Sequence, residues 1–197
     1  MAACYADKTL FRSRIVMEQY RFGQGEYQYF AYPLPTIVQN LRESLYPQLV
    51  SLSNRWHEAL ELKTRFPNES DRFLETCHQA GQTRPTPLLL KYETGDYNCL
   101  HQDLYGELTF PLQVAIALSQ PGQDFMGGEF VLTEQKPRSQ SRVHVLNLQQ
   151  GDAVIFAVSH RPVQGTRGTY RVNLKHGVSS LHSGQRFCLG IIFHDAA

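Results

Sequence analysis

The sequence lacks the features that mark membrane-spanning and disulfide-stabilised proteins. None of its apolar runs approaches the ~20 residues that a membrane span needs, and the first residues, MAACYADKTLFRSR, contain no apolar segment typical of a signal peptide. It has four cysteines, Cys4, Cys77, Cys99 and Cys188, and no CxxC pair, which argues against a zinc site or a disulfide scaffold. These absences predict a soluble protein of the reducing cytoplasm that does not bind a membrane.

Net charge is also nearly absent, since 19 Lys and Arg residues face 18 Asp and Glu residues. Hydrophobic residues make up 42% and charged residues 19% of the chain, which is typical of a globular protein and excludes a disordered one. The charge is unevenly spread, because residues 135–194 hold eight basic residues and a single acid, Asp152. At 197 residues and without internal repeats, the sequence predicts one domain spanning 1–197.

The first half of the chain has the apolar spacing of helices. Between residues 35 and 81, one apolar set precedes Pro47 and another follows it, which predicts two helices separated at this proline. A third helix is expected from near Ser70 to Gly81, where glycine would end it. The aromatic segment Tyr20–Tyr32 predicts a strand or a hairpin.

The second half has the short apolar runs and turn residues of β-strands. Seven strands are expected, at Pro87–Tyr92, Leu112–Ser119, Glu129–Thr133, Arg142–Leu148, Ala153–Val158, Thr169–Lys175 and Phe187–Phe193. No helical stretch separates them, which disfavours a doubly wound α/β sheet. The sequence therefore predicts a mainly β fold, a jelly roll over about 86–194, supported by N-terminal helices over about 35–81.

A group of polar residues in the second half has the chemistry of a metal site. In His101-Gln102-Asp103, the two outer side chains would point to the same face of an extended segment. About 0.3 tripeptides of this His-x-Asp pattern are expected by chance in a chain of this composition, so the motif alone is weak evidence for a metal site. Together with His176 they form a set of two imidazoles and one carboxylate, which leaves three positions open on an Fe(II) ion. A 2-oxo acid and O2 can take those positions. Arg186, expected on a strand neighbouring that of His176, could hold the far carboxylate of the acid.

Longer motifs carry a family resemblance. The segments KYETGDYNCLHQD, GGEFVL, GDAVIF and HGVSSLHSGQRF resemble Fe(II)- and 2-oxoglutarate-dependent dioxygenases, whose fold is a double-stranded β-helix. The segments LHQDLYGE, SHRPVQGTRGTYRVNLKHGVS and LGIIFHDA resemble a bacterial branch of oxygenases acting on damaged DNA, also named as proline-hydroxylase-like. Relatives of this branch carry some tens of residues before the segment matching ADKTLFRSR, so the chain is expected to lack their N-terminal segment.

The resemblance implies roles for individual residues. His101, Asp103 and His176 would bind Fe(II), Arg186 would bind the co-substrate 2-oxoglutarate, and O2 would be the second co-substrate. Tyr92 matches a tyrosine that contacts 2-oxoglutarate, with a plain core tyrosine as the alternative.

Two further interpretations concern the residues after the GDAVIF motif. His160 is the rival for the distal metal ligand, but Pro162 would interrupt the strand that such a role requires. A basic group of Arg161, Arg167 and Arg171 either steers an anionic substrate to the mouth of the barrel or forms a solvated face.

Several functions remain open at this stage. The first hypothesis is a dioxygenase that hydroxylates a C–H bond, with oxidative dealkylation of damaged nucleic acid as its suggested use. Hydroxylation of a prolyl or another amino-acid side chain is the alternative. A non-catalytic, cupin-like sensor of a metal or carboxylic acid is a third, which the complete ligand set together with Arg186 disfavours. The sequence leaves the oligomeric state open.

Overall fold

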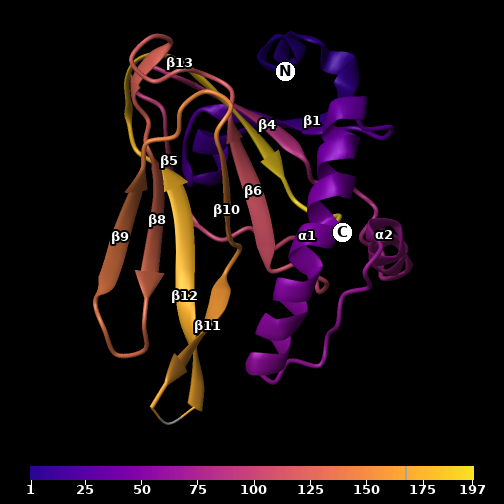
Figure 1. Ribbon diagram of the computed structural model, residues 1–197. Helices are drawn as coiled ribbons and strands as arrows, with labels where there is room; N and C mark the ends of the chain where they lie inside the picture. Colours follow the sequence, from indigo (N-terminus) through magenta and orange to yellow (C-terminus); the bar gives the residue numbers. More distant parts are fainter. Residues whose placement is uncertain (167) are drawn as a thin grey trace.

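The computed structural model describes residues 1–166 and 168–197, and in these residues two antiparallel sheets face each other (Figure 1). The larger sheet has the order β1 (Phe11–Val16), β3 (Glu26–Phe30), β4 (Leu88–Glu93), β13 (Leu181–Ile191), β6 (Leu112–Ala117) and β10 (Ala153–Ala157), with β7 (Phe125–Gly127) beside β13. The smaller sheet has the order β2 (Gly23–Gln24), β5 (Tyr97–His101), β12 (Gly168–Val178), β8 (Phe130–Gln135) and β9 (Ser141–Leu146), with β11 (His160–Gly165) beside β12. The predicted mainly β jelly roll is confirmed.

Two helices, α1 (Thr36–Ala59) and α2 (Ser70–Gln79), lie beside the larger sheet (Figure 1). Their apolar faces share one core cluster with residues of β3, β4, β6 and β13. Short 3-10 helices occupy Ala2–Ala6, Lys8–Leu10 and Met17–Tyr20. None of the helices in the described part of the chain is both long enough and apolar enough to cross a membrane.

The predicted break between two helices at Pro47 is wrong, because α1 runs through this proline. Proline removes one backbone hydrogen bond, here the one that the carbonyl of Glu43 would accept. Both Pro47 and Glu43 are exposed, so water can reach that carbonyl. The buried positions continue on either side of the proline, with Tyr46 before it and Leu49 after it. Burial of this continuous face keeps the two halves in one helix.

The third predicted helix is confirmed as α2. The backbone N–H of Gly81 donates to the carbonyl of His78 at 3.0 Å, and that of Gln82 donates to Cys77 at 2.9 Å. Gly81 has a φ of 81°, the left-handed conformation in which glycine ends helices without a steric cost.

All seven predicted strands are present, but the prediction missed others. It did not include β1, β5, β7 or β11, which are short or have polar, partly exposed sequences. The aromatic segment after Tyr20 provides β3, which pairs with β1 and β4 rather than forming a hairpin of its own. Pro162 does not interrupt a strand, because β11 pairs with β12 alone among the described residues, and an edge strand tolerates proline.

The central strands of the larger sheet are buried on both faces. In β6, Leu112 and Val114 belong to the core shared with the helices, whereas Gln113 and Ala115 face the smaller sheet. This period of two follows from the alternation of side chains along a strand. One face of each central strand therefore stabilises the helical layer, while the other is available for a site between the sheets.

A buried ion pair joins the helices to the end of the chain. The Arg42 guanidinium on α1 lies 2.7 Å from Asp195 Oδ1, and both side chains are at most 1% exposed. The hydroxyl of Tyr32 and Nε2 of His78 on α2 each lie 2.8 Å from Asp195 Oδ2. Removal of Asp195 would leave the Arg42 guanidinium buried without a counterion, and removal of Arg42 would leave the Asp195 carboxylate with only Tyr32 and His78.

We expect Arg42→Ala to lower the free energy of unfolding by about 3–5 kcal/mol, because it leaves the Asp195 charge buried without its cation. The control is Arg72→Ala, which breaks the 3.7 Å pair with Glu69 whose side chains are 73% and 61% exposed. That change should cost about 1 kcal/mol at most. Urea unfolding followed by circular dichroism measures both, and equal losses would contradict the structural role of the buried pair.

Candidate metal centre

The site begins with the pairing of β5 and β12. His101, the last residue of β5, lies directly opposite His176 on β12, and the centroids of the two rings are 4.2 Å apart. The register shifts just after this pair, at Gly177. A Cβ at position 177 would lie 2.6 Å from the carbonyl oxygen of Asn98, so glycine permits the close approach of the strands.

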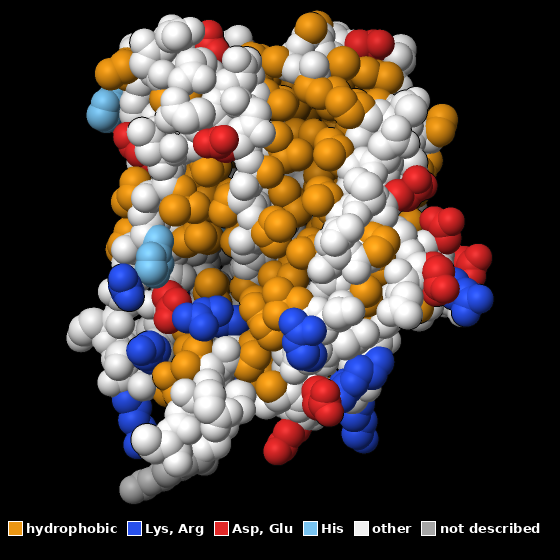
Figure 2. Space-filling model, in the orientation of Figure 1, with side chains coloured by type: hydrophobic (Ala, Val, Ile, Leu, Met, Phe, Trp, Pro, Cys, Tyr) orange, Lys and Arg blue, Asp and Glu red, His pale blue; other side chains and the backbone are white. Residues whose placement is uncertain are grey.

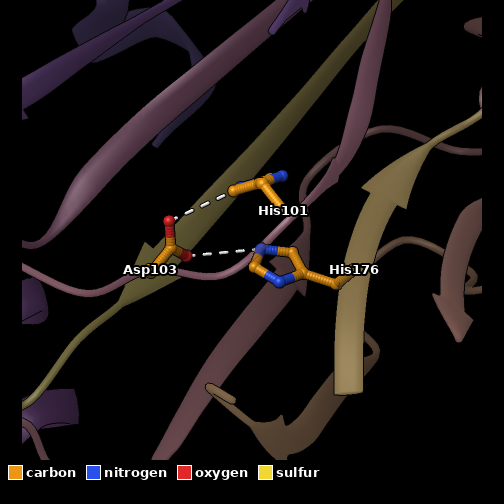
Figure 3. A group of neighbouring side chains, drawn as sticks. All are labelled: His101, Asp103 and His176. Atoms are coloured by element: carbon orange, nitrogen blue, oxygen red, sulfur yellow. Dashed lines mark ion pairs between the residues drawn. The ribbon is translucent and has the colours of Figure 1, made fainter. Parts of the chain in front are cut away.

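Asp103 completes the group from the loop that follows β5 (Figure 3). Its Oδ1 lies 3.4 Å from Nε2 of His101, and its Oδ2 lies 3.3 Å from Nε2 of His176. One ligand atom from each residue lies within 4.8 Å of the others. The structure therefore brings together the three residues that the sequence singled out, with Asp103 and His176 buried and His101 partly exposed.

Neighbouring side chains orient these three groups. The hydroxyl of Tyr105 donates to Asp103 Oδ1 at 2.6 Å, and the amide Nε2 of Gln113 donates to Asp103 Oδ2 at 2.8 Å. Nδ1 of His101 lies 2.8 Å from the carbonyl oxygen of Cys99. If Nδ1 carries the proton, the lone pair of Nε2 points toward the carboxylate.

Sequence analysis missed the two donors to Asp103. Gln113 could have been noticed as a polar residue within the otherwise apolar strand Leu112–Ala117, because a polar side chain in a buried strand needs a partner. Tyr105 carried no comparable signal.

The ionisation of the group suits a cation. Burial alone would raise the pKa of Asp103, but the charges and hydrogen bonds of His176 and His101 hold it well below its usual value. Burial lowers the pKa of His176. For His101, burial acts in the same direction but is outweighed by hydrogen bonding to Asp103 and by its charge, so the pKa rises. An ionised carboxylate between two imidazoles is a donor set for a divalent transition metal.

A cavity of about 270 Å³ opens between the sheets at this group. Its walls include apolar and aromatic side chains from both sheets, among them Phe130 and Phe156, together with Tyr92 and Arg186. Burial raises the pKa of Tyr92, whose side chain is completely buried, so its hydroxyl keeps its proton. The His101–Asp103–His176 group, called the metal group below, and the buried guanidinium of Arg186 thus share one largely apolar space. We call this space the metal cavity.

Arg186 is the least satisfied charged group in this cavity. It is 4% exposed, its Nη1 has no hydrogen-bond partner in the described part of the chain, and no ion pair joins it to a described acidic residue. The guanidinium lies 5.4 Å from the ring centroid of Tyr92. Because a buried charge needs a counterion, this environment fits an anionic ligand.

The expected position of Arg186 needs one correction. It does not lie on a strand neighbouring that of His176, because β13 belongs to the larger sheet and β12 to the smaller one. Both residues line the same cavity from opposite sheets. Arg186 also lies within β13 and not at its beginning, directly opposite Tyr92 of β4.

The remaining candidates lie outside the metal group. His160 begins β11, its Nδ1 lies 3.0 Å from the hydroxyl oxygen of Ser159, and it does not belong to the three-residue group found in the described residues. The guanidinium of Arg161 lies 2.7 Å from Glu134, whereas Arg171 is exposed on β12. Arg167 lies outside the described residues, so the structure places only Arg161 and Arg171 of the predicted basic group.

Residues 25–196 match a family described as "Oxygenase, catalysing oxidative methylation of damaged DNA". The chain belongs to this oxygenase family. Two Mycobacterium tuberculosis proteins, named as uncharacterized proteins MT2286 and Rv2227, are each 48% identical to it over 168 residues, which cover 85% of this chain and 72% of theirs. The expected relationship to oxygenases associated with damaged DNA is thereby confirmed, and the protein is an oxidoreductase.

Solved structures of 2-oxoglutarate oxygenases are more distant. A prolyl-4-hydroxylase from Pseudomonas putida is 12% identical with a TM-score of 0.48, covering 100% of this chain and 83% of that one. An oxidoreductase of the 2OG-Fe(II) oxygenase family from Burkholderia pseudomallei is 17% identical with a TM-score of 0.39, covering 64% of this chain and 53% of that one.

We expect one Co(II) or Mn(II) ion to bind per chain and His101→Ala, Asp103→Ala and His176→Ala each to weaken that binding at least about tenfold, because each removes one of three ligands. His160→Ala is the matched control and should bind as the wild type does. Visible absorption of Co(II) and electron paramagnetic resonance of Mn(II) measure the binding. Retained binding in His176→Ala with loss in His160→Ala would show that the distal ligand is assigned to the wrong histidine.

Proposed function

We propose that this oxygenase depends on Fe(II) and 2-oxoglutarate and hydroxylates a C–H bond of its substrate. The observation that carries the proposal is the presence in one cavity of the His101–Asp103–His176 group and of Arg186, which has no ion-pair partner in the described residues and whose Nη1 has no hydrogen-bond partner there. Two imidazoles and one carboxylate form the ligand set of non-haem Fe(II) oxygenases, which leaves positions open for other ligands. A sensor of either a metal or a carboxylic acid would not need both a metal ligand set with open positions and a buried guanidinium.

The residues present fit both groups. His101, Asp103 and His176 would hold Fe(II), which would activate O2 while 2-oxoglutarate is converted to succinate and CO2, with one oxygen atom inserted into the substrate C–H bond. Arg186 would bind the far carboxylate of 2-oxoglutarate through parallel N–H donors. Tyr92, whose hydroxyl stays protonated, would donate a hydrogen bond to the same end.

Other side chains in the cavity would support the same reaction. Gln113 and Tyr105 hold the carboxylate of Asp103 in place by hydrogen bonds to its two oxygens. The amide oxygens of Asn98 and Gln113 are buried and have no partner among the described residues, which leaves them available to a polar ligand or to water. Phe130 and Phe156 give the cavity apolar walls, which would limit the access of water to the reacting atoms.

For the substrate, we propose a methylated base in nucleic acid. Hydroxylation of an N-methyl carbon would give a hydroxymethyl group, which would leave as formaldehyde while its hydroxyl proton returns to the base nitrogen. Support comes from the family description, which names damaged DNA, and from the excess of basic residues in 135–194. A base stacked in a duplex cannot reach a metal between two sheets, so a single strand or an extruded base is required.

Arg186→Ala should weaken 2-oxoglutarate binding at least about tenfold, since a hydrogen bond to a charged group is worth about 1.5–3 kcal/mol. Arg186→Lys should recover part of the affinity, because an ammonium retains the charge but lacks the planar fork. Isothermal titration of the Co(II)-loaded protein with 2-oxoglutarate measures both. The control, Arg142→Ala, changes an exposed arginine on β9. Unchanged affinity in Arg186→Ala would remove this residue from the co-substrate site.

Turnover identifies the substrate. Succinate release should rise when methylated single-stranded DNA is added and should depend on Asp103, because no metal would be held without it. Methylated RNA, methylated duplex DNA and proline-containing peptides are the comparison substrates. Turnover on a peptide alone would reject the nucleic-acid substrate and leave the dioxygenase in place, whereas no succinate with any substrate would contradict the proposed reaction.

A further inference from the structure

A second hollow lies beside the metal cavity, at the end of α1. It has a volume of about 290 Å³ and is formed by the last turn of α1, the loop after it, the loop after Asp103 and the strands β11 and β12. The side chains that matter for its chemistry are Trp56, His57, Lys63, Leu104, His160 and Arg171. We call it the α1–β12 pocket.

The α1–β12 pocket carries an excess of basic groups. Arg171 and Lys63 are cations, His57 and His160 are imidazoles, and Glu107 is the one acidic residue among the described residues that line it. None of the four basic side chains forms an ion pair with a described acidic residue. An anion would therefore find unshared positive partners here.

The pKa values of His57 and His160 are both lowered by burial and by nearby positive charge. Burial and then the positive charge of Arg171 lower the pKa of His160. Burial also lowers the pKa of His57, and the charges of Arg65 and Arg171 act in the same direction. Both histidines are therefore neutral near pH 7. Nδ1 of His57 donates to the carbonyl oxygen of Thr64 at 3.2 Å, whereas Nδ1 of His160 can accept from the Ser159 hydroxyl at 3.0 Å and leave an N–H on Nε2 for an anion. Arg171 supplies the charge.

The pocket and the metal cavity share a wall. Leu104, which lines the pocket, directly follows Asp103, which lines the cavity. Gln102 lines the cavity, and its amide donates to the carbonyl oxygen of Ser159, a pocket residue, at 3.1 Å. A chain molecule with one unit in the metal cavity could thus place an adjacent unit in the pocket.

Basic side chains are visible on the surface near the end of α1. Figure 2 shows a band of hydrophobic side chains between the sheets and α1, with Lys and Arg side chains toward the end where α1 and the β11–β12 hairpin terminate. Among the pocket residues, Leu104 is 53% exposed, so it offers apolar surface at the shared wall.

We infer that the α1–β12 pocket binds a backbone phosphate of single-stranded nucleic acid, next to the nucleotide whose base enters the metal cavity. Arg171 binds the phosphate with help from Lys63 and the imidazole of His160, and Trp56 provides an aromatic surface against which a neighbouring base can pack. This inference rests on the proposed function, since it assumes a nucleic-acid substrate.

The pocket contains its own probe, because Trp56 is the protein's single tryptophan. Metal-free full-length protein is titrated with single-stranded hexathymidylate and, separately, with inorganic phosphate, while tryptophan fluorescence is recorded. We expect saturable quenching by the oligonucleotide. Arg171→Ala should weaken its binding about tenfold and reduce the slope of log K against log salt by about 0.7, the value for one lost contact to a single strand.

Two variants control for charge and folding. Arg142→Ala removes an exposed arginine of β9 outside the pocket and should leave affinity and salt slope unchanged. Arg171→Lys should keep most of the salt slope, because the charge remains. Circular dichroism checks that each variant is folded, which we expect because Arg171 is exposed.

Equal weakening in Arg171→Ala and Arg142→Ala would overturn the inference, because it would indicate a diffuse charge effect. Binding of inorganic phosphate without binding of the oligonucleotide would overturn the assignment to a nucleic-acid strand. The titration needs no metal, so its result is separate from that of the metal-binding and succinate experiments. Loss of oligonucleotide binding in Arg171→Ala would support the pocket even if the protein did not use 2-oxoglutarate.

Discussion

The pairing of β5 with β12 is the constraint on which the site depends. It sets His101 opposite His176, and the chain that leaves β5 brings Asp103 to both rings within two residues. β12 is in turn paired with β8 and β11, so the histidine on it is held inside a sheet rather than on a mobile loop. Gly177 allows the strands to approach, and Gln113 and Tyr105 then fix the carboxylate from the side of the larger sheet and from the following loop.

The alternation of side chains along the larger sheet extends this constraint to the rest of the cavity. In β13, Arg186 and Cys188 face the cavity, whereas Leu189 and Ile191 belong to the core shared with the helices. A shift of one residue in register would turn the guanidinium toward the helices and place an apolar side chain in the cavity. The apolar contacts of α1 and α2 thus stabilise the position of a charged group on the opposite face of the sheet. They also place the end of α1 beside the metal cavity, where the α1–β12 pocket forms.

Many of the secondary-structure elements and part of the metal group could be predicted because they depend on local sequence patterns. The strand runs after Pro85 have a period of two and are separated by turn residues, and α2 ends at a glycine in the left-handed conformation. His101 and Asp103 are separated by one residue, so an extended segment directs both side chains to one face whatever surrounds them. His176 and Arg186 are connected to the first two by no local spacing, and were added from the chemistry of the ligand set and from the family motifs.

What the sequence by itself determined, then, is the β-rich jelly roll and the chemical types gathered at the metal group. Only the tertiary structure decided that α1 continues through Pro47, that β11 continues through Pro162, and that Arg186 faces His176 from the opposite sheet. The exposed positions of Glu43 and Pro47 on α1 and the edge position of β11 make the prolines tolerable, and neither property can be read from neighbouring residues. Local sequence specifies periodicity and turns, whereas strand partners and buried neighbours arise from contacts between residues far apart in the chain.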